Sequence, residues 1–345
     1  MVINFSFDFS HPAHYLAFRN VLLNRDKLGF EPFIFIQEKE SLKDLLVEDN
    51  LTFLIRINKK TTLSRISLLP RDILYIRKAM KERDIVSNFG KVSIVGSWAA
   101  KTLNKRSIVI DDTDTPFGQI NVCRWAATEI WTPYCYNRRL GKKHKKFKGI
   151  FHLAYLDPSV FQPNKSIPQS LGLLERGKPI FIRIVSYKAT HDWKNRNNSD
   201  DFEEIINKLD KEYEIVLSIE GKNYPKRLDK YVKKFKAADY HHILAYSKLY
   251  IGSGASSAAE ASVLGVPSIY TNYQKPGFIQ WLEHKYRIIK SIETDFLNFE
   301  DVRSILKKKE SKWRDIQKKI LDDCINVPNL IKNLVKREIE IHNNQ

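Results

Sequence analysis

Cysteine is scarce in this sequence, which has only Cys123, Cys135 and Cys324 among its 345 residues. Their odd number, their wide spacing and the lack of a C-x-x-C pair argue against a disulfide framework and a zinc site, and fit a reducing cytosol. No run of about 18 uncharged apolar residues exists, so we expect no membrane-spanning helix. The first residues lack the basic segment and apolar core of a signal peptide. These absences predict a cytoplasmic protein.

Acidic residues are also in the minority, because 40 Asp and Glu stand against 58 Lys and Arg, for a net charge of +18. Such an excess implies an anionic partner, which could be nucleic acid, an anionic membrane surface or a phosphorylated substrate. A general bias toward lysine is the alternative explanation. The basic residues lack the interleaved aromatics and the small modular fold of common RNA-binding proteins, so nucleic acid is the least favoured partner.

The sequence does contain a regular alternation of apolar strands and helices. In the first part of the chain this alternation predicts a mostly parallel sheet with helices on both faces. The strands expected there cover residues 2–9, 32–37, 51–57, 92–96 and 106–111. The pattern breaks in the proline-containing segment 151–173, which we interpret as a linker. A second series begins with strands at 179–185 and 214–219.

These segments predict an α/β protein with two Rossmann-like domains that face each other across a cleft. The N-terminal domain is expected over residues 1–160 and the C-terminal domain over 174–325, followed by a helical tail over 326–345. The length of the chain fits two domains of ordinary size.

The stretch YIGSGASSAAEASVLGVPSIY (250–270) joins a strand to a helix through a glycine–serine turn. The unpaired N–H groups and the positive dipole end of a helix N-terminus suit a phosphate. A tight packing turn is the alternative. The third glycine of G-x-G-x-x-G is replaced by Ser257, and no G-x-x-x-x-G-K-[ST] occurs, which disfavours a nicotinamide site and a P-loop kinase. Glu260 shares a helical face with Ser256 and Ser257, so it could accept hydrogen bonds from ribose hydroxyls, unless it is a solvated first-turn acid.

The same strand, turn and helix, with Glu260 before an "EA…LGVP" segment, resemble the nucleotide-sugar site of GT-B enzymes. This group includes glycosyltransferases and the non-hydrolysing UDP-N-acetylglucosamine 2-epimerases. The whole chain is still more similar to a little-characterised archaeal and bacterial family grouped with them. The matching stretches are HPAHYLAFRNVL (11–22), SIVIDDTD (107–114), IRIVSYKATHD (182–192), HHILAYSKLYIGSG (241–254) and SSAAEASVLGVPSI (256–269).

The resemblance implies that the C-terminal domain binds the donor nucleotide and the N-terminal domain the acceptor. It implies that Gly254, Ala255 and Ser256 offer hydrogen-bond donors to the diphosphate, that Glu260 holds the ribose, and that SIEGK (218–222) recognises the base. The adjacent Ser253 and Ser257 are further candidate substrate-binding residues. The epimerases typically have Ser-Gly-Gly where this chain has Gly254-Ala255-Ser256, a departure that weighs against epimerase chemistry.

Further candidate residues lie at or just beyond strand ends, where open α/β sheets place their ligands. Arg183, Ser186 and Lys188 follow one strand, and a cation there could neutralise a diphosphate leaving group without a metal. His242, expected just before a helix, could touch the phosphates. Surface ion pairs and a structural histidine are the alternatives.

In the N-terminal domain, His11 and His14 flank a proline at a strand-to-helix turn. His14 is a candidate general base for an acceptor hydroxyl, with a packing or capping role as the alternative. Asp111 and Asp112 follow a strand, and we interpret Asp111 as a substrate-binding residue and Asp112 as a catalytic one. No metal site and no cofactor are expected.

Together these features predict an inverting, metal-independent glycosyltransferase that uses a nucleotide-diphosphate sugar, with a UDP-sugar favoured, and a glycan or lipid-linked acceptor. A 2-epimerase-like isomerase is the alternative. The segment YNRRLGKKHKKFKG (136–149) carries seven Lys and Arg residues. It predicts peripheral association with an anionic membrane at its inner face, with a solvated loop as the alternative.

Overall fold

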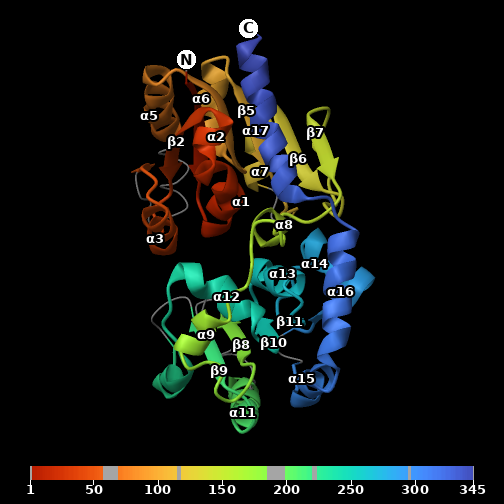
Figure 1. Ribbon diagram of the computed structural model, residues 1–345. Coiled ribbons are helices and arrows are strands. Elements are labelled where there is room, and N and C mark those ends of the chain that lie inside the picture. Colours follow the sequence, from red (N-terminus) through yellow and green to blue (C-terminus); the bar gives the residue numbers. More distant parts are fainter. Residues whose placement is uncertain are drawn as a thin grey trace. The chain divides into compact units, whose positions relative to one another are not determined.

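The computed structural model describes residues 2–56, 69–114, 118–184, 199–219, 224–293 and 297–344. The chain divides into two compact units. The first comprises Met1–Val160 and Cys324–Gln345, and the second comprises Phe161–Asp323. Each unit contains one parallel sheet with helices packed on it (Figure 1).

The first unit is built on seven parallel strands in the order β3-β2-β1-β4-β5-β6-β7. The strands are β1 (Ile3–Phe9), β2 (Phe30–Ile36), β3 (Phe53–Ile55), β4 (Ile85–Lys91), β5 (Arg106–Ile110), β6 (Glu129–Pro133) and β7 (His144–Phe147). The helices are α1 (Pro12–Leu23), α2 (Arg25–Leu28), α3 (Glu40–Glu48), α5 (Leu69–Glu82), α6 (Ile94–Thr102), α7 (Gly118–Cys123), α8 (Leu153–Leu156) and α17 (Val327–Asn343).

Alternation along β1 places its aromatic residues on one face of the sheet and its polar residues on the other. Phe7 and Phe9 pack against Phe18 of α1. Asp8 faces the opposite helix layer, where the Gly96 amide of α6 lies 3.4 Å from its Oδ2 atom. Helices therefore cover both faces of the sheet.

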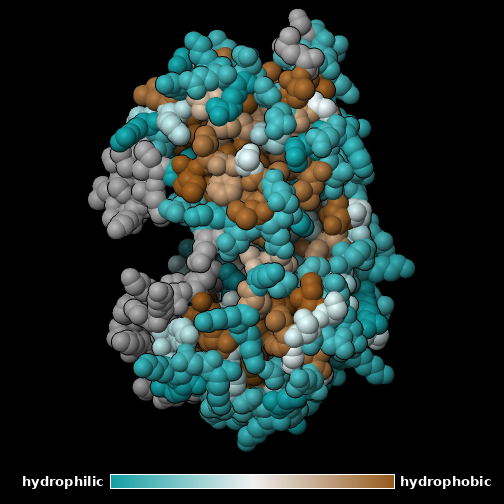
Figure 2. All heavy atoms as spheres, turned by 60° about the vertical axis from the view of Figure 1, so that its left-hand side comes forward, coloured by the Kyte–Doolittle hydropathy of each residue, from teal (hydrophilic) through white to brown (hydrophobic). Residues whose placement is uncertain are grey.

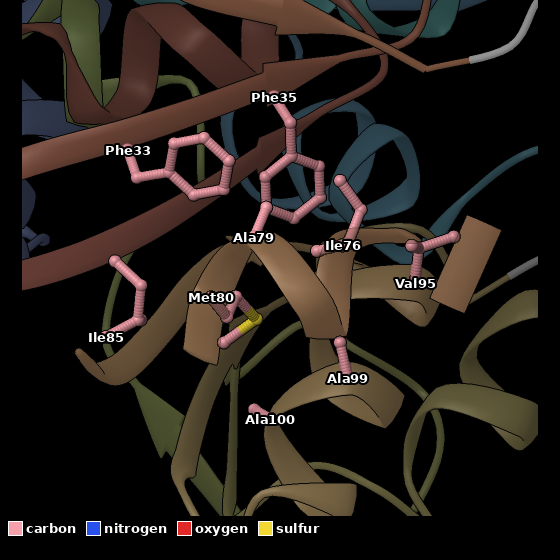
Figure 3. Close-up of a cluster of buried hydrophobic side chains, with 9 residues drawn as sticks. All are labelled: Phe33, Phe35, Ile76, Ala79, Met80, Ile85, Val95, Ala99 and Ala100. Carbon is pink, nitrogen blue, oxygen red and sulfur yellow. The ribbon is translucent and has the colours of Figure 1, made fainter. Parts of the chain in front are cut away.

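A buried hydrophobic cluster joins α5 and α6 to strands β2 and β4. Figure 3 shows its nine side chains, which are Phe33, Phe35, Ile76, Ala79, Met80, Ile85, Val95, Ala99 and Ala100. Burying such side chains contributes roughly 1.5–3 kcal/mol each for the large ones. This cluster fixes α6, whose N-terminus lies beside the candidate site described below.

The C-terminal helix α17 belongs to the first unit and packs on α1 and α8 (Figure 1). Its Glu338 is fully buried and accepts hydrogen bonds from Ser87 Oγ at 2.8 Å and from Arg106 Nε at 2.7 Å. The last residues of the chain are thereby fixed to strands β4 and β5.

The second unit has five parallel strands in the order β12-β11-β10-β8-β9. They are β8 (Ile180–Ile184), β9 (Ile215–Ile219), β10 (Leu249–Gly252), β11 (Ser268–Tyr270) and β12 (Ile289–Ser291). The α-helices are α9 (Ser166–Ser170), α11 (Ser199–Asp210), α12 (Tyr240–Ala245), α13 (Ala255–Val263), α14 (Gly277–Trp281), α15 (Phe299–Leu306) and α16 (Glu310–Asp322). The 3-10 helices η1 (Lys226–Tyr231) and η2 (Ala237–Asp239) and the π-helical segment η3 (Leu282–Tyr286) lie between them.

The strand predicted at residues 92–96 is wrong, because the strand of this region is β4, which ends at Lys91, and α6 begins at Ile94. Between them Val92 has a φ of 45°, in the left-handed region that β-branched residues rarely adopt. Its N–H still donates to Ile110 O at 3.2 Å. This sharp turn separates Lys91 from Ser93.

The basic segment 136–149 contributes an edge strand, β7, to the sheet of the first unit. Leu140 and Phe147 are buried in the unit, so the apolar character of the segment belongs to the core. Lysines are a common means of protecting an exposed sheet edge from pairing with other chains.

Hydrophilic residues cover much of the face in Figure 2, with smaller hydrophobic groups between them. Within the described residues, no helix is long and apolar enough to cross a membrane.

Candidate active site

Both sheets contain a topological switch point, where successive crossovers leave in opposite directions. In the first unit it lies between β1 and β4, and in the second unit between β8 and β10. Open parallel sheets bind ligands outside the carboxyl ends of their strands at such points. Each unit therefore offers one candidate ligand site, and most of the residues singled out in the sequence that the structure describes lie at one of these two places.

In the second unit, the turn after β10 leaves its helix N-terminus open to a ligand. Gly252 lies so close to β8 that a Cβ atom would be 2.4 Å from Arg183 O. Gly254 is the N-cap of α13 and has no side-chain cap. The first backbone hydrogen bond of the helix runs from Ala258 N to Gly254 O, which leaves the amides of Ala255, Ser256 and Ser257 without a helical acceptor. These amides and the helix dipole suit a phosphate.

Glu260, one turn into α13, is only 5% exposed, so the alternative of a solvated acid is wrong. Its Oε1 atom lies 3.4 Å from Nε2 of His241 on α12, which is also buried. Helical side chains lean toward the N-terminus of their helix. The carboxylate is thus held just behind the glycine–serine turn.

Arg183 lies near the carboxyl end of β8, beside the same switch point. Its Nη1 atom is 3.5 Å from Ser218 Oγ at the end of β9, and its guanidinium lies 5.5 Å from the centre of the Tyr240 ring. The arginine is therefore tied to the neighbouring strand and to α12. The predicted residues Ser186 and Lys188, and residues 220–222 of the predicted base-binding loop, lie outside the described residues.

His242 lies within α12, so the prediction that it precedes a helix is wrong. Its Nδ1 atom accepts a hydrogen bond from the Asn164 amide at 3.0 Å, and its ring stacks on Phe161 at 4.9 Å between centroids. These contacts fix the imidazole against the segment that enters the second unit. They give His242 a structural role whether or not it also meets a ligand.

In the first unit, His11 is the N-cap of α1 and accepts a hydrogen bond from the Ala13 amide at 3.2 Å. His14 lies in the first turn, partly exposed, with its Nδ1 atom 3.4 Å from Ser10 N and 3.2 Å from Ser10 Oγ. The Ser10 amide can only donate, which favours a proton on Nε2 of His14. A proton on Nδ1 would instead be donated to Ser10 Oγ and leave Nε2 as the acceptor.

Burial lowers the pKa of His14 well below its usual value, and the positive charges of Lys91, His11, Lys39 and Arg56 lower it further. The imidazole is therefore neutral at physiological pH. A neutral imidazole can accept a proton or donate a hydrogen bond, whereas an imidazolium could only donate.

The loop after β5 contains two adjacent buried carboxylates with different surroundings. Asp111 accepts hydrogen bonds from the amides of Asp112 and Thr113 and from the Tyr136 hydroxyl, the last at 2.9 Å. Burial and the neighbouring charge of Asp112 raise the pKa of Asp111 to about 6. Asp114 Oδ2, further along, accepts the Asn137 amide at 3.0 Å. Asp111 thus both anchors the loop and titrates near neutral pH.

Asp112 forms a buried ion pair with Lys91, whose Nζ atom is 2.6 Å from Asp112 Oδ1. Thr113 Oγ1 also donates to Oδ1 at 2.7 Å, and His152 Nε2 lies 3.9 Å from Oδ2. Burial alone would raise the pKa of Asp112, but Lys91, His152 and Thr113 outweigh it and lower that pKa. Among the described residues, Oδ2 accepts no hydrogen bond.

A second buried ion pair lies on the other side of the switch point. Asp8 Oδ1 is 3.1 Å from Arg56 Nη2, and Asp8 Oδ2 accepts a hydrogen bond from Ser93 Oγ at 2.7 Å. The Gly96 amide also approaches Asp8. The protein therefore supplies its own carboxylate to the N-terminus of α6, where a phosphate could otherwise bind.

Sequence reasoning did not identify several of these residues, which are Asp8, Arg56, Lys91, Ser93, Tyr136 and His152. Lys91 and Asp8 do stand at or near strand ends, and that position was the available signal. The described residues contain no cluster of three or more His, Cys, Asp or Glu side chains that could hold a metal ion.

No protein-family model and no curated protein sequence matches this chain. Solved structures are similar along nearly its whole length. A Listeria monocytogenes protein assigned as a UDP-N-acetylglucosamine 2-epimerase aligns with a TM-score of 0.73 and 15% identity, over 99% of this chain and 97% of its own. The UDP-GlcNAc 2-epimerase from Neisseria meningitidis, solved with UDP-GlcNAc, aligns with a TM-score of 0.72 and 10% identity, over 98% and 100%. The glycosyltransferase VinC, in complex with dTDP, aligns with a TM-score of 0.64 and 10% identity, over 98% and 100%.

At these low identities the likeness defines the fold. The chain has the two-domain α/β architecture of GT-B enzymes, and the predicted fold class is confirmed. The similar structures include both epimerases and glycosyltransferases, the two groups of enzymes that the sequence resembles.

Proposed function

We propose that the protein is a glycosyltransferase that moves a sugar from a nucleotide-diphosphate sugar to a hydroxyl group of a glycan or a lipid-linked glycan. The observation that carries this proposal is the open N-terminus of α13, with the buried Glu260 directly behind it, at the switch point of the second sheet. A diphosphate fits the free amides, and a ribose fits the carboxylate. The similar structures solved with UDP-GlcNAc and dTDP support a nucleotide partner, and a UDP-sugar is the favoured donor.

In the proposed reaction, the acceptor oxygen attacks the anomeric carbon, the bond from that carbon to the diphosphate oxygen breaks, and the nucleoside diphosphate leaves. Such a single displacement inverts the anomeric centre. Ser253 to Ser257 and Arg183 stabilise the charge of the leaving group, without a metal. His14 and Asp112 are the candidate bases, because both are in the unprotonated form at neutral pH. For His14 this role requires the tautomer that donates its Nδ1 proton to Ser10 Oγ, because only that tautomer leaves Nε2 as the proton acceptor. His14 is partly exposed whereas Asp112 is 2% exposed, which makes His14 the more accessible of the two.

A 2-epimerase is the second candidate function. Asp111 favours it, because a carboxyl group with a pKa of about 6 can exchange a proton near neutral pH. An epimerase acts on the donor alone, whereas a transferase needs an acceptor. Incubation with a sugar nucleotide, with and without an acceptor, therefore tests the proposal against this alternative.

We further propose that the enzyme acts in the cytoplasm in polysaccharide biosynthesis and binds reversibly to the inner face of the membrane through β7. Five exposed lysines lie in this strand or next to it, at positions 142, 143, 145, 146 and 148. Each lysine near an anionic surface contributes about 1 kcal/mol. Because Leu140 and Phe147 are buried, the attraction would be electrostatic.

Sedimentation with vesicles at low and high salt tests this membrane proposal. We expect binding to anionic vesicles that is released by salt and lost when Lys142, Lys143, Lys145 and Lys146 are changed to Glu. Equal binding to neutral and anionic vesicles, or no effect of the four substitutions, would contradict it.

A further inference from the structure

Lys91 is a buried cation at the switch point of the first sheet, and no step of the proposed reaction assigns it a role. It is the last residue of β4, and its side chain is 10% exposed. A buried ammonium group is costly unless it is paired, because it loses its hydration. Asp112 supplies the partner, at 2.6 Å.

Strand register shows which side of the sheet the ammonium occupies. Gly90 pairs with Asp8, so Lys91 and Phe9 are neighbours on the opposite face. Phe9 packs on α1, the helix that carries His14. On the same side, Lys91 Nζ lies 4.6 Å from the centre of the Phe151 ring, next to α8, which packs on α1. The ammonium therefore lies on the side of the sheet that α1 covers, next to the segment that leads into α8.

Two candidate bases share this cation. Asp112 receives the 2.6 Å ion pair. The positive charge of Lys91 also acts on His14. Burial is the largest cause of the lowered pKa of His14, and the charge of Lys91 is the second largest. Lys91 is also the largest favourable charge acting on Asp112. Lys91 thus lowers the pKa of both groups.

We infer that Lys91 is a positioning residue of the proposed transfer, whose ammonium holds the Asp112 carboxylate through the 2.6 Å ion pair and, from the side of the sheet where α1 carries His14, disfavours protonation of that imidazole. The role of Lys91 in catalysis rests on the proposed function, but the Asp112 carboxylate and the neutral His14 imidazole exist without substrate. The other charged or titratable groups around His14 are His11, Lys39 and Arg56, and those around Asp112 are His152 and Asp111. These groups remain when Lys91 is changed.

Titration of the full-length protein by NMR, following the imidazole signals, tests this inference. The chain has nine histidines, and a His14→Gln variant assigns the signal of His14. In the wild-type protein we expect His14 to stay neutral over the range in which ordinary histidines titrate, about pH 5.5 to 8. In Lys91→Met its pKa should rise, because one positive charge is removed, and in Lys91→Arg it should stay low. Lys78→Met, at an exposed position of α5, is the matched control.

An unchanged His14 titration in a folded Lys91→Met protein would overturn the inference. If Lys91→Met does not fold, Asp112→Asn provides the second test, because it removes the anion but keeps the ammonium. The pKa of His14 should then stay low or fall, and a rise would overturn the inference. Expected titrations without transfer activity would contradict the proposed function and leave the role of Lys91 in setting these charge states intact.

Discussion

His241 Nε2 lies 3.4 Å from Glu260 Oε1, and both side chains are buried. The contact links α12 to α13 directly behind the Gly252–Ser256 turn. A carboxylate already held in this way loses little additional side-chain entropy when a ligand binds, and such preorganisation favours affinity. The pair gives a physical reason why Glu260 could bind a ribose although little of its surface is exposed.

Substitution of Glu260 or Ser256 by alanine should weaken nucleotide binding. Each change removes hydrogen bonds to a charged or buried ligand group, worth about 1.5–3 kcal/mol, so the Kd for UDP should rise roughly ten- to a hundredfold. Isothermal titration calorimetry measures this. Ser262→Ala is the control, since Ser262 donates to Ala258 O within the same helix. Wild-type affinity for UDP in both variants would contradict the proposed phosphate site at the N-terminus of α13.

Changes at His14 and Asp112 should affect turnover and leave nucleotide affinity intact. Loss of a general base typically lowers the rate by a factor of roughly a hundred or more. Steady-state kinetics of His14→Ala and Asp112→Asn, with UDP affinity measured in parallel, would show this. Because Asp112→Asn leaves Lys91 without its anion, its unfolding free energy must also be measured. Near-normal turnover in both variants would show that neither His14 nor Asp112 is the general base.

The stability of the protein should depend on Asp111 between pH 4 and 6. Its folded pKa of about 6 lies above the ordinary 3.8, so the folded state holds a proton that the unfolded state releases. Stability contributed by this proton is present below about pH 4 and is lost as pH rises through 6. The loss is about 3 kcal/mol at most. Asp112, with its lowered pKa, acts in the opposite sense at lower pH.

Urea unfolding of Asp111→Asn at pH 4.5 and pH 7 checks this prediction. Relative to wild type, the variant should gain about 2 kcal/mol in unfolding free energy between the two pH values. Asp114→Asn, in the same loop, controls for the loss of a carboxylate. A pH-independent difference between Asp111→Asn and wild type would contradict the raised pKa.

Removal of Glu338 should destabilise the first unit. This buried carboxylate holds α17 to Ser87 and Arg106. Breaking a buried pair typically costs about 3–5 kcal/mol, and the partial exposure of Arg106 reduces this to about 2 kcal/mol. Chemical denaturation of Glu338→Ala measures the effect. Glu340→Ala, at an exposed position of the same helix, should change stability by less than about 0.5 kcal/mol. Equal stability of the two variants would show that α17 docks without Glu338.

Much of the fold follows from local patterns in the sequence. The alternation of Phe5, Phe7 and Phe9 with polar residues predicted β1, and the glycine–serine turn predicted the junction between β10 and α13. Such signals are strong because they depend on neighbouring residues alone. His14 and Asp112 could likewise be proposed because both stand at strand ends.

The strand β4 could not be identified in the same way. Asn88 and Gly90 are typical of turns, whereas the next residues are apolar and β-branched. In the structure, Asn88 is buried and hydrogen-bonded to Ser6 and Ser107 of the neighbouring strands. A Cβ at position 90 would come within 2.9 Å of Asp8 O, so only glycine fits there. Tertiary contacts therefore override the local preference.

Because the strand was predicted at the wrong residues, the ion pair between Lys91 and Asp112 could not be predicted either. With a strand expected at residues 92–96, Lys91 falls in a loop, and its pairing with Asp112 depends on register between β4 and β5. Asp8 was missed for a related reason, because it lies within a strand whose aromatic residues dominate the pattern. Contacts between strands distant in sequence are what the linear pattern cannot supply.

The central claim, that a sugar is transferred from a nucleotide-diphosphate donor, is tested most directly by ¹H NMR of the full-length protein with UDP-, GDP-, CMP- and dTDP-sugars. Each is incubated with and without a mixture of soluble glycan and short-chain lipid-linked acceptors. The account predicts that, with one donor, free nucleotide and an inverted glycosidic linkage form only when acceptor is present. Formation of the 2-epimer of the donor sugar without acceptor, or no reaction with any donor, would contradict it.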